Sequence, residues 1–394
     1  MNLSIFQRES EALADEIIAQ RRDFHRHPEL GFQEHRTAGI VADAMNDLGL
    51  KICTGVAETG VIALLKGERP GPTILLRFDM DALPIQEETG ASYASTFDGV
   101  MHACGHDGHT AIGMAVAKLL HSHRQDLPGT VKLVFQPAEE GLNGAERMVE
   151  EGVLLDPTPD YTLAMHLWND KPVGWIGVTP GTAMAGSERL EIEIAGRGGH
   201  GAAPHQTADP VLATAQVICA LQSVVSRNLD PGKPAVVSVT KIQAGDAFNV
   251  IPSRALLGGT IRTFDGEVRD LVLQRVKEIV CGIAEAMGCE AKVKIKRLTP
   301  PVINNQALAI RIQSLIKRVF PEAIVDSEEV VMGSEDMAFM MEDVPGCYMF
   351  VGSGNPAKGL DAPHHNPHYD FDEVVLPKAS ALMAAAAWML LEGE

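Results

Sequence analysis

The chain has 394 residues, of which 45% are hydrophobic and 22% charged, and its formal net charge is −19. This length exceeds the size at which one hydrophobic core usually stops growing, so we expect two domains, and the composition is typical of a globular protein rather than a disordered or fibrous one. The negative charge repels phosphate backbones and anionic lipids, which argues against nucleic acid or a membrane as partner.

The two ends of the chain and its cysteines predict a cytoplasmic protein. Residues 1–11 lack the basic segment followed by a long apolar one that marks a secretory signal. The apolar run at 379–391 is too short to span a bilayer and is typical of a core helix. The six cysteines have no paired spacing, which fits a reducing compartment better than a disulfide framework.

The first part of the chain alternates predicted helices and strands. Apolar residues at helical spacing predict the helices, and short apolar runs bounded by Gly and Pro predict buried strands. The expected helices span 9–24, 37–48, 110–120 and 145–151, and the expected strands span 61–65, 73–78, 131–135 and 161–165. This order predicts an α/β domain with a mixed, mostly parallel sheet flanked by helices, in which functional side chains gather beyond the carboxyl ends of the strands.

From about residue 186 the order changes to strand, helix, two strands, helix, strand, which is that of a ferredoxin-like α+β fold. The strands are expected at 189–195, 235–242, 255–263 and 290–296, and the helices at 209–226 and 266–287. After residue 299 the α/β pattern returns, with a helix at 308–319, a strand at 348–351 and a final helix. We therefore expect a catalytic domain made of residues 1–184 and 299–394, interrupted by a smaller domain at 185–298.

One segment, M101-H-A-C-G-H-D-G-H-T110, gathers side chains that hold transition metals. Three other polar segments each follow a predicted strand: Asp79–Asp81, Glu139–Glu140 and His166. His364 and His365 come from far along the chain. The sequence therefore predicts a metal centre, whose expected ligands are Cys104, His106, Glu140, His166 and His365.

Such a centre can hydrolyse an amide bond. Divalent metals produce a nucleophilic water near neutral pH and stabilise the charge that develops on the carbonyl oxygen, and two metals do so more strongly than one. Because neighbouring side chains at a strand end diverge, Glu139 should not share a metal with Glu140. We expect Glu139 to take the proton from the water and pass it to the leaving nitrogen, and Asp81 to hold a ligand imidazole in one tautomer.

Other interpretations remain open for several of these residues. His166 fits a hydrogen-bonded core histidine equally well, and the Glu139–Glu140 pair fits an exposed acidic pair. His25 and His27 belong either to a structural turn or to the rim of the site. The cysteines other than Cys104 are expected to be small buried hydrophobic residues.

Two familiar motifs do not carry a function here. G196-R-G-G-H-G201 satisfies the dinucleotide-binding pattern, but Pro204 and a polar loop follow it where a helix should begin. The chain also contains no G-x-S-x-G sequence, so the nucleophilic serine of an α/β-hydrolase lacks its signal.

Eight motifs together carry a resemblance to a known family. They are D79-M-D-A-L-P, M101-H-A-C-G-H-D-G-H-T, F135-Q-P-A-E-E-G, A164-M-H, G198-G-H-G-A-A-P-H, N249-V-I-P, G259-T-I-R-T-F and H365-N-P-H-Y-D-F-D-E. In this order they resemble the aminoacylase and hippurate hydrolase branch of the di-metal amidohydrolase and carboxypeptidase family, over nearly the whole chain. The resemblance implies that the five ligands named above hold two divalent metals and that Glu139 is the acid and base. Asp79 stands where related peptidases have a metal-binding His, and Cys104 makes up the ligand number.

The resemblance also gives roles to the smaller domain, which would act as a lid and commonly mediates dimerisation. His200 resembles a lid histidine that approaches the scissile carbonyl, often from the partner subunit, and could donate to the oxyanion. Asn249 and Arg262 resemble groups that hold the substrate carboxylate, although Arg262 could instead pair with Asp265. Spacing to the following Pro favours His365 over His364 as the ligand.

The sequence thus predicts a metal-dependent hydrolase of N-acyl amino acids, such as N-acetyl or N-benzoyl forms, which releases a carboxylic acid and a free amino acid. A dipeptidase or metallo-carboxypeptidase with the same site is the alternative among enzymes, and a metal-dependent binding protein is the alternative outside them. The ligand mixture suits manganese or zinc, and also cobalt or nickel. We expect a homodimer formed through the lid domain, with a tetramer as the other possibility.

Overall fold

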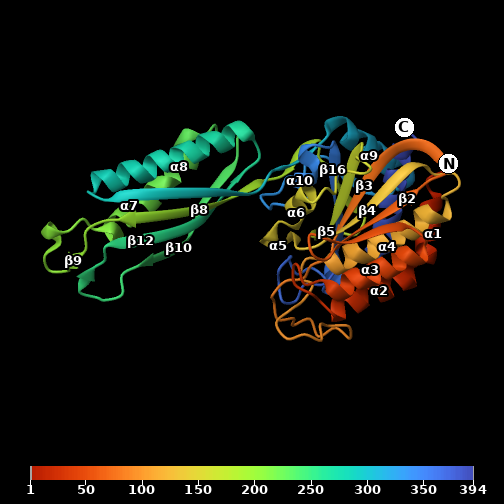
Figure 1. Ribbon diagram of the computed structural model, residues 1–394, viewed down its shortest axis with the longest axis horizontal. Coiled ribbons are helices and arrows are strands. Elements are labelled where there is room, and N and C mark those ends of the chain that lie inside the picture. The colour runs from red at the N-terminus through yellow and green to blue at the C-terminus, as the bar shows by residue number, and fades with distance from the viewer. Residues whose placement is uncertain (1, 394) are drawn as a thin grey trace. The chain divides into compact units, whose positions relative to one another are not determined.

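The computed structural model describes residues 2–393, which divide into two compact units (Figure 1). The larger unit contains the residues up to 183, residues 302–330 and the residues from 336 onward. The smaller unit contains residues 184–301 and also the short segment 331–335, which the sequence did not indicate. Each unit has its own hydrophobic core.

The larger unit is built on an eight-stranded mixed sheet. Its four central neighbours β4, β3, β5 and β16 run parallel, whereas β1, β2 and β4 pair antiparallel at one side and β6 pairs antiparallel with β16 at the other. In spatial order the strands are β1 (Lys51–Val56), β2 (Gly60–Lys66), β4 (Pro128–Gln136), β3 (Arg69–Asp79), β5 (Tyr161–Pro172), β16 (Gly346–Gly354), β6 (Trp175–Gly177) and β15 (Ile324–Asp326). This arrangement confirms the predicted mixed, mostly parallel sheet.

Helices pack against this sheet and against one another. α4 (His106–Ser122) and α11 (Val375–Leu391) lie side by side and contact the central strands. Every residue of α11 except Lys378 is buried, so the late apolar run is a core helix. Among the described helices, none combines the length and hydrophobicity needed to cross a membrane. The other helices of this unit are α1 (Ile5–Ala12), α2 (Ala14–Arg26), α3 (His35–Asp47), α5 (Glu139–Leu142), α6 (Gly144–Glu150), α9 (Gln306–Val319) and α10 (Ala338–Glu342).

Two expectations about these elements are wrong in detail. The predicted helix at 9–24 is two helices, separated at Leu13, because α1 packs mainly against α11 whereas α2 packs against α4. The predicted strand at 161–165 does not end at His166 but continues as β5 to Pro172, because β16 pairs with it from Thr162 to Trp168 and again at Pro172. The other neighbour, β3, pairs with β5 only as far as Ala164. His166 therefore still lies beyond the part of β5 that is covered on both sides.

The smaller unit is an antiparallel four-stranded sheet with two helices on one face (Figure 1). Asp209 and Asp265 begin the helices, because each side chain accepts hydrogen bonds from two backbone N–H groups of the first turn. The strand order β10-β12-β8-β13 is that of a ferredoxin-like fold, as predicted. The elements are β8 (Gly186–Ala195), α7 (Pro210–Ser223), β10 (Ala235–Ala244), β12 (Arg254–Thr263), α8 (Gly266–Ala286) and β13 (Glu290–Thr299).

Short elements complete both units. In the larger unit, β7 (Gly181–Met184) pairs with β14 (Val302–Asn304). In the smaller unit, β9 (Gly199–His200) pairs with β11 (Val250–Ile251), and a 3-10 turn at Pro204–Gln206 follows it. The glycine-rich segment before residue 201 thus opens no long helix, in agreement with the rejection of dinucleotide binding.

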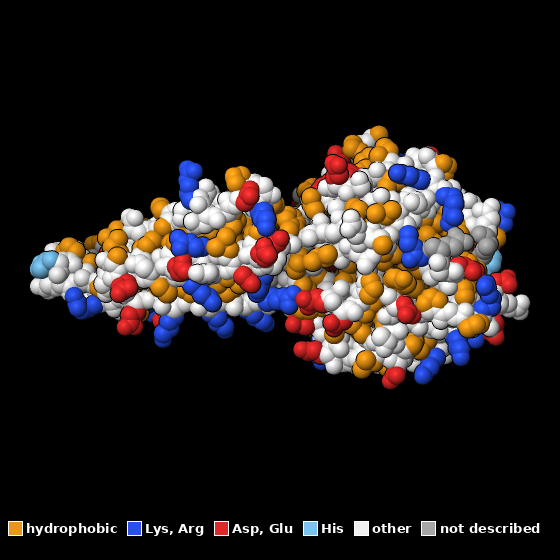
Figure 2. Space-filling model, turned by 90° about the horizontal axis from the view of Figure 1, so that it is seen from above, with side chains coloured by type: hydrophobic (Ala, Val, Ile, Leu, Met, Phe, Trp, Pro, Cys, Tyr) orange, Lys and Arg blue, Asp and Glu red, His pale blue; other side chains and the backbone are white. Residues whose placement is uncertain are grey.

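The surface and the cysteines show how the remaining side chains are distributed. On the face shown in Figure 2, Lys and Arg side chains are scattered among Asp, Glu and hydrophobic side chains.

The expectation that the cysteines other than Cys104 are buried is wrong for Cys53, Cys219 and Cys281. Cys53 lies on the edge strand β1, and the other two lie on the outer faces of α7 and α8, where no element covers them.

Candidate metal centre

The five predicted ligands of the larger unit lie together. In each of two groups, the donor atoms are all within 4.8 Å of one another: Cys104 with His106 and His166, and Cys104 with Glu140 and His365. Cys104 belongs to both groups, and its Sγ lies 3.4 Å from His166 Nε2. His365 Nε2 lies 3.1 Å from Glu140 Oε1. Four separate parts of the chain therefore supply one cluster of sulfur, nitrogen and carboxylate donors.

The loop before α4 brings two of these ligands into place. Gly105 has a φ of +91°, and a Cβ there would lie 2.8 Å from the hydroxyl oxygen of Tyr369, so only glycine fits between Cys104 and His106. The backbone N–H of His365 donates to the carbonyl oxygen of Ala103 at 2.8 Å. This hydrogen bond fixes the late ligand beside the early ones.

Hydrogen bonds determine which nitrogen of His106 can bind a metal. Its Nδ1 lies 2.9 Å from the carbonyl oxygen of Asp81, which can only accept, so Nδ1 carries a proton. Its Nε2 is buried and has no hydrogen bond within residues 2–393. Burial lowers the pKa of His106, but the carboxylates of Asp79 and Asp81 outweigh this and raise it to about 10. A divalent cation would take the place of that extra proton on Nε2.

The same logic applies to His166 and Cys104. His166 Nδ1 donates to the carbonyl oxygen of Leu167 at 2.6 Å, which leaves Nε2 directed at the Cys104 sulfur. Burial and the nearby His109 lower the pKa of His166 well below its ordinary value, so the imidazole is neutral, the form that binds metals. Burial and the Glu140 carboxylate raise the pKa of the Cys104 thiol, an effect that a bound cation reverses. These donors fit divalent transition metals.

A third nearby group, Asp79 with His106 and His109, does not form a metal site of its own. Both carboxylate oxygens of Asp79 are taken, one by Arg77 and the other by His109 Nδ1 at 2.6 Å. His109 Nε2 accepts from the backbone N–H of Leu167 at 2.9 Å. Burial alone would raise the pKa of Asp79, but Arg77 and the histidines lower it well below its ordinary value. Asp79 and His109 therefore form a hydrogen-bonded pair next to the ligand cluster and bind the backbone beside His166.

Residues 75–388 match the family described as Peptidase family M20/M25/M40. The chain belongs to this family. It is 41% identical to N-acetylcysteine deacetylase of Bacillus subtilis, over 95% of this chain and 97% of the relative. It is 37% identical to thermostable carboxypeptidase 1 of Saccharolobus solfataricus, over 95% and 94%. The crystal structure of the Bacillus subtilis YXEP protein, described as a dinuclear metal binding peptidase, superposes with a TM-score of 0.85 at 37% identity, covering 97% of this chain and 99% of that one. The suspected family is confirmed, and the chain is a metal-dependent M20 amidohydrolase.

Two carboxylates of this M20 enzyme, Glu139 and Glu140, lie closer together than the sequence suggested. Their nearest oxygens and a His106 nitrogen are all within 4.8 Å of one another. The argument from diverging strand side chains was wrong, because the chain is not extended here: Ala138 has a φ of +56° and the two glutamates open a short helical turn. Asp81 contacts both parts of the site, with Oδ1 3.2 Å from His106 Nδ1 and Oδ2 accepting from the Glu140 N–H at 2.9 Å.

The neighbouring histidines 364 and 365 have different surroundings. His364 Nε2 donates to the carbonyl oxygen of Leu167 at 2.9 Å, and its ring stacks near Trp168 and Tyr369. His365 instead faces Glu140, whose hydrogen bond raises the pKa of the imidazole. This geometry favours His365 as the ligand of the M20 centre.

Three predicted site residues, His200, Asn249 and Arg262, belong to the smaller unit. His200 and Asn249 are exposed and adjacent, since His200 pairs with Val250 in the β9–β11 ladder. Arg262 is half-buried in β12 and donates to Ser334 Oγ at 2.6 Å, while Asp265 caps α8, so the alternative Arg262–Asp265 pair is wrong. Burial lowers the pKa of Arg262. The roles expected for these three residues in binding the substrate stay predictions.

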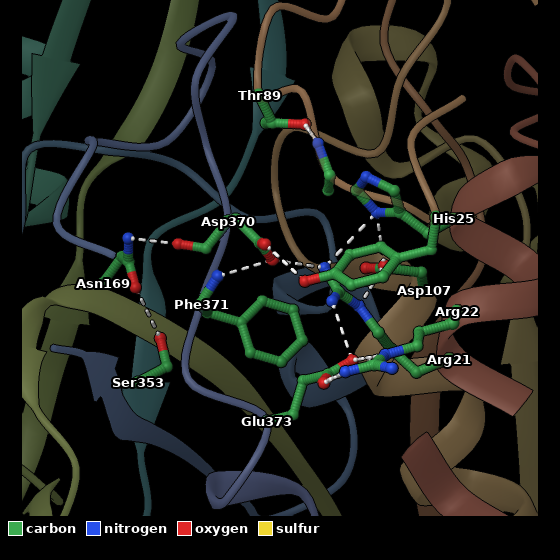
Figure 3. A network of polar contacts seen from close by, with 12 residues as sticks. Arg21, Arg22, His25, Thr89, Asp107, Asn169, Ser353, Asp370, Phe371 and Glu373 are labelled. Carbon is green, nitrogen blue, oxygen red and sulfur yellow. Dashed lines mark hydrogen bonds and ion pairs between the residues drawn. The ribbon is translucent and has the colours of Figure 1, made fainter. Parts of the chain in front are cut away.

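Behind the cluster lies a buried polar network that the sequence did not indicate (Figure 3). Arg21 of α2 is fully buried and donates to Asp107 at 2.7 Å, to Asp370 at 2.8 Å and to Glu373 at 3.1 Å. Asn169 donates to the carbonyl oxygen of Asp370 at 3.0 Å. Asp107, Asn169 and Asp370 each lie within five residues of a proposed ligand, His106, His166 and His365 respectively. The network therefore links the three segments that carry these ligands. One signal was available: Arg21 lies four residues after Ile17 and three before Phe24, on the buried stripe of its helix.

His25 and His27 can also be assigned. His25 Nδ1 lies 2.8 Å from Asp107 and its Nε2 lies 3.2 Å from Glu87, so it is a buried member of the same network. His27 Nδ1 donates to the carbonyl oxygen of Asp23 within its own helix. Neither histidine faces the five ligands, and both serve the structure around the site.

Proposed function

We propose that this M20 amidohydrolase cleaves N-acyl amino acids, such as N-acetyl or N-benzoyl forms, into a carboxylic acid and a free amino acid. The observation that carries the proposal is the cluster of donor atoms with the carboxylate of Glu139 beside it. The 41% identity to an N-acetylcysteine deacetylase supports the substrate class. We place Cys104, His106, Glu140, His166 and His365 as the metal ligands.

The protein groups divide the remaining work. Two divalent metals, manganese or zinc with cobalt or nickel as other candidates, would supply Lewis acidity and make a water acidic. Glu139 takes the proton of the attacking water and returns it to the leaving nitrogen. Asp81 keeps His106 in the tautomer that leaves Nε2 available.

The smaller unit completes the proposed site as a lid. His200 donates to the oxyanion, from its own chain or from a partner. Arg262 and Asn249 bind the free carboxylate of the substrate, for which a guanidinium offers two parallel donors. We expect a dimer formed through this unit, in the cytoplasm. Sedimentation that gives a monomer at working concentration would contradict the dimer and with it a role for His200 across subunits.

The substrate class can be tested with chelator-treated enzyme. N-acetylmethionine, N-benzoylglycine and a simple dipeptide are incubated with and without added manganese or zinc, and release of free amino acid is measured. We expect metal-dependent release from the two acyl amino acids and little from the dipeptide. Tight metal binding without cleavage of either acyl amino acid would refute the proposed substrate class.

The role of Glu139 has its own test. Replacing Glu139 by Gln should lower kcat by roughly 10²–10⁴-fold, the usual contribution of general acid–base catalysis, while the bound metal per chain stays the same. Glu150→Gln is the control, because Glu150 is an exposed carboxylate at the end of α6. Near-normal turnover by Glu139→Gln would rule out this residue as the base.

A carboxypeptidase or dipeptidase is the second candidate, supported by the 37% identity to a thermostable carboxypeptidase. It would use the same ligands and the same base with a longer substrate. Faster release of amino acid from the dipeptide than from both acyl amino acids would favour it.

A further inference from the structure

The two peptide N–H groups on either side of Glu139 are each held by a carboxylate from another part of the larger unit. Ala138 N donates to Glu34 Oε1 at 2.8 Å, and Glu140 N donates to Asp81 Oδ2 at 2.9 Å. Glu34 lies in the turn between α2 and α3, and Asp81 follows β3. Hydrogen bonds to carboxylates are stronger than those between neutral groups, so the backbone around Glu139 is fixed from two sides.

The residue that donates to Glu34 is strained. Ala138 is fully buried and has a φ of +56°, a left-handed conformation that costs a non-glycine residue about 1–2 kcal/mol. The turn that carries Glu34 packs directly on it, because a Cβ on Gly31 would lie 3.0 Å from Ala138 Cα. A different backbone angle at Ala138 would redirect the next side chain, that of Glu139.

Glu34 itself is placed at a cost in stability. Its side chain is fully buried, and its other oxygen accepts from Thr59 Oγ1. It forms no ion pair with any Lys, Arg or His that the structure describes. Burial raises the pKa of Glu34 to about 7. A buried carboxylate without a cationic partner is unfavourable for folding even when it is hydrogen-bonded, so a role in the site explains its presence better than stability does.

We infer that Glu34 is a positioning residue for Glu139, which it serves by holding Ala138 in the left-handed conformation that directs the Glu139 carboxylate toward His106 and Glu140. This inference rests on the proposed role of Glu139 as general base. Glu34 does not contact the reacting atoms and acts only through the backbone of Ala138.

Three variants separate positioning from packing. Glu34→Ala removes the acceptor for Ala138 N and should lower kcat by roughly 10–100-fold, the scale of a misplaced catalytic group, with KM within twofold and metal content unchanged. Glu34→Gln keeps an acceptor oxygen at the same place and should retain at least half of kcat. Glu29→Ala is the matched control from the same turn: its carboxylate accepts from the N–H groups of Arg36 and Thr37 and does not touch Ala138, so it should lower the melting temperature without lowering kcat.

A double variant shows whether Glu34 acts through Glu139. In the Glu139→Gln background, Glu34→Ala should cause no further loss of kcat, because residues that act as one unit are not additive. A full additional loss, or wild-type kcat in Glu34→Ala, would overturn the inference. If Glu34→Ala does not fold, Glu34→Asp keeps the charge but ends one methylene short of Ala138 N, and wild-type kcat there would also overturn it. If Glu139 is not the general base, the result is different, because the single variant Glu139→Gln would then remain active.

Discussion

Glu34 is a buried carboxyl group whose contribution to the free energy of unfolding depends on pH. Its ordinary pKa of 4.5 is raised to about 7 by burial, with a contribution from the nearby Asp81. A group whose pKa is raised in the folded state stabilises the fold below its unfolded pKa, and this contribution is lost as pH rises through the folded pKa. The contribution is therefore lost between the ordinary pKa of 4.5 and the raised value of about 7, and above pH 7 the native state is less stable by roughly 3 kcal/mol, from a shift of this size.

The neutral variant Glu34→Gln should remove this pH dependence. We expect its free energy of unfolding to match the wild type near pH 4, below the ordinary pKa of the carboxyl group, and to exceed it at pH 8, as measured by urea denaturation at both values. An equal difference at the two pH values would show that Glu34 ionises without cost in the folded protein.

Single residues also show what the sequence could and could not predict. Cys104, His106 and His166, whose donor atoms lie together in the structure, were predicted as ligands because their chemistry is typical of metal binding and because His166 follows a predicted strand. Which nitrogen of each histidine is free follows from backbone carbonyl oxygens, which every residue type carries. Glu34 was missed for the same reason, because its partner is the backbone N–H of Ala138 and leaves no residue pattern.

At the scale of elements, the Arg21 network joins α2 to the start of α4 and to the segment before α11. Three carboxylates surround a guanidinium that is fully buried. Removing one partner of a buried ionic network leaves uncompensated charge and usually costs about 3–5 kcal/mol. Arg21→Ala should therefore lower the free energy of unfolding by about that amount.

Arg22→Ala is the matched control for this measurement. Arg22 contacts the same Glu373 but its side chain is 40% exposed, so its loss should cost no more than about 1 kcal/mol. Chemical denaturation of both variants, with the wild type in parallel, gives the comparison. Equal decreases in the free energy of unfolding for the two variants would contradict the larger stabilisation that we assign to Arg21.

Elements were predicted better than their ends. Strong periodicity identified α3, α8 and the strands of the smaller unit within a few residues. The break at Leu13 was not visible, because no Pro or Gly marks it and only packing against two different helices requires it. The extension of β5 past His166 depends on pairing with β16, almost two hundred residues later in the chain. Long-range pairing of this kind has no local sequence signal.

At the scale of the whole molecule, metal binding should stabilise one unit and not the other. All five proposed ligands belong to the larger unit, and the two units have separate hydrophobic cores. A ligand that binds only the folded state stabilises the part that it binds. Removal of metal by a chelator should therefore increase amide hydrogen exchange in α4 and at the carboxyl end of β5, and leave α7 and α8 unchanged. An equal increase in α7 and α8 would contradict this assignment of the ligands.

The burial of nearly all of α11 has a consequence for how the protein is made. Domains generally fold as units during synthesis, from the N-terminus onward. The smaller unit has its four strands and two helices by residue 299, so it can fold while the chain is still growing. The larger unit cannot complete its core before α11, residues 375–391, has been synthesised. Its nascent sheet therefore stays incompletely covered until residues 375–391 have left the ribosome, so the unit that carries the proposed metal ligands completes its fold after the smaller unit.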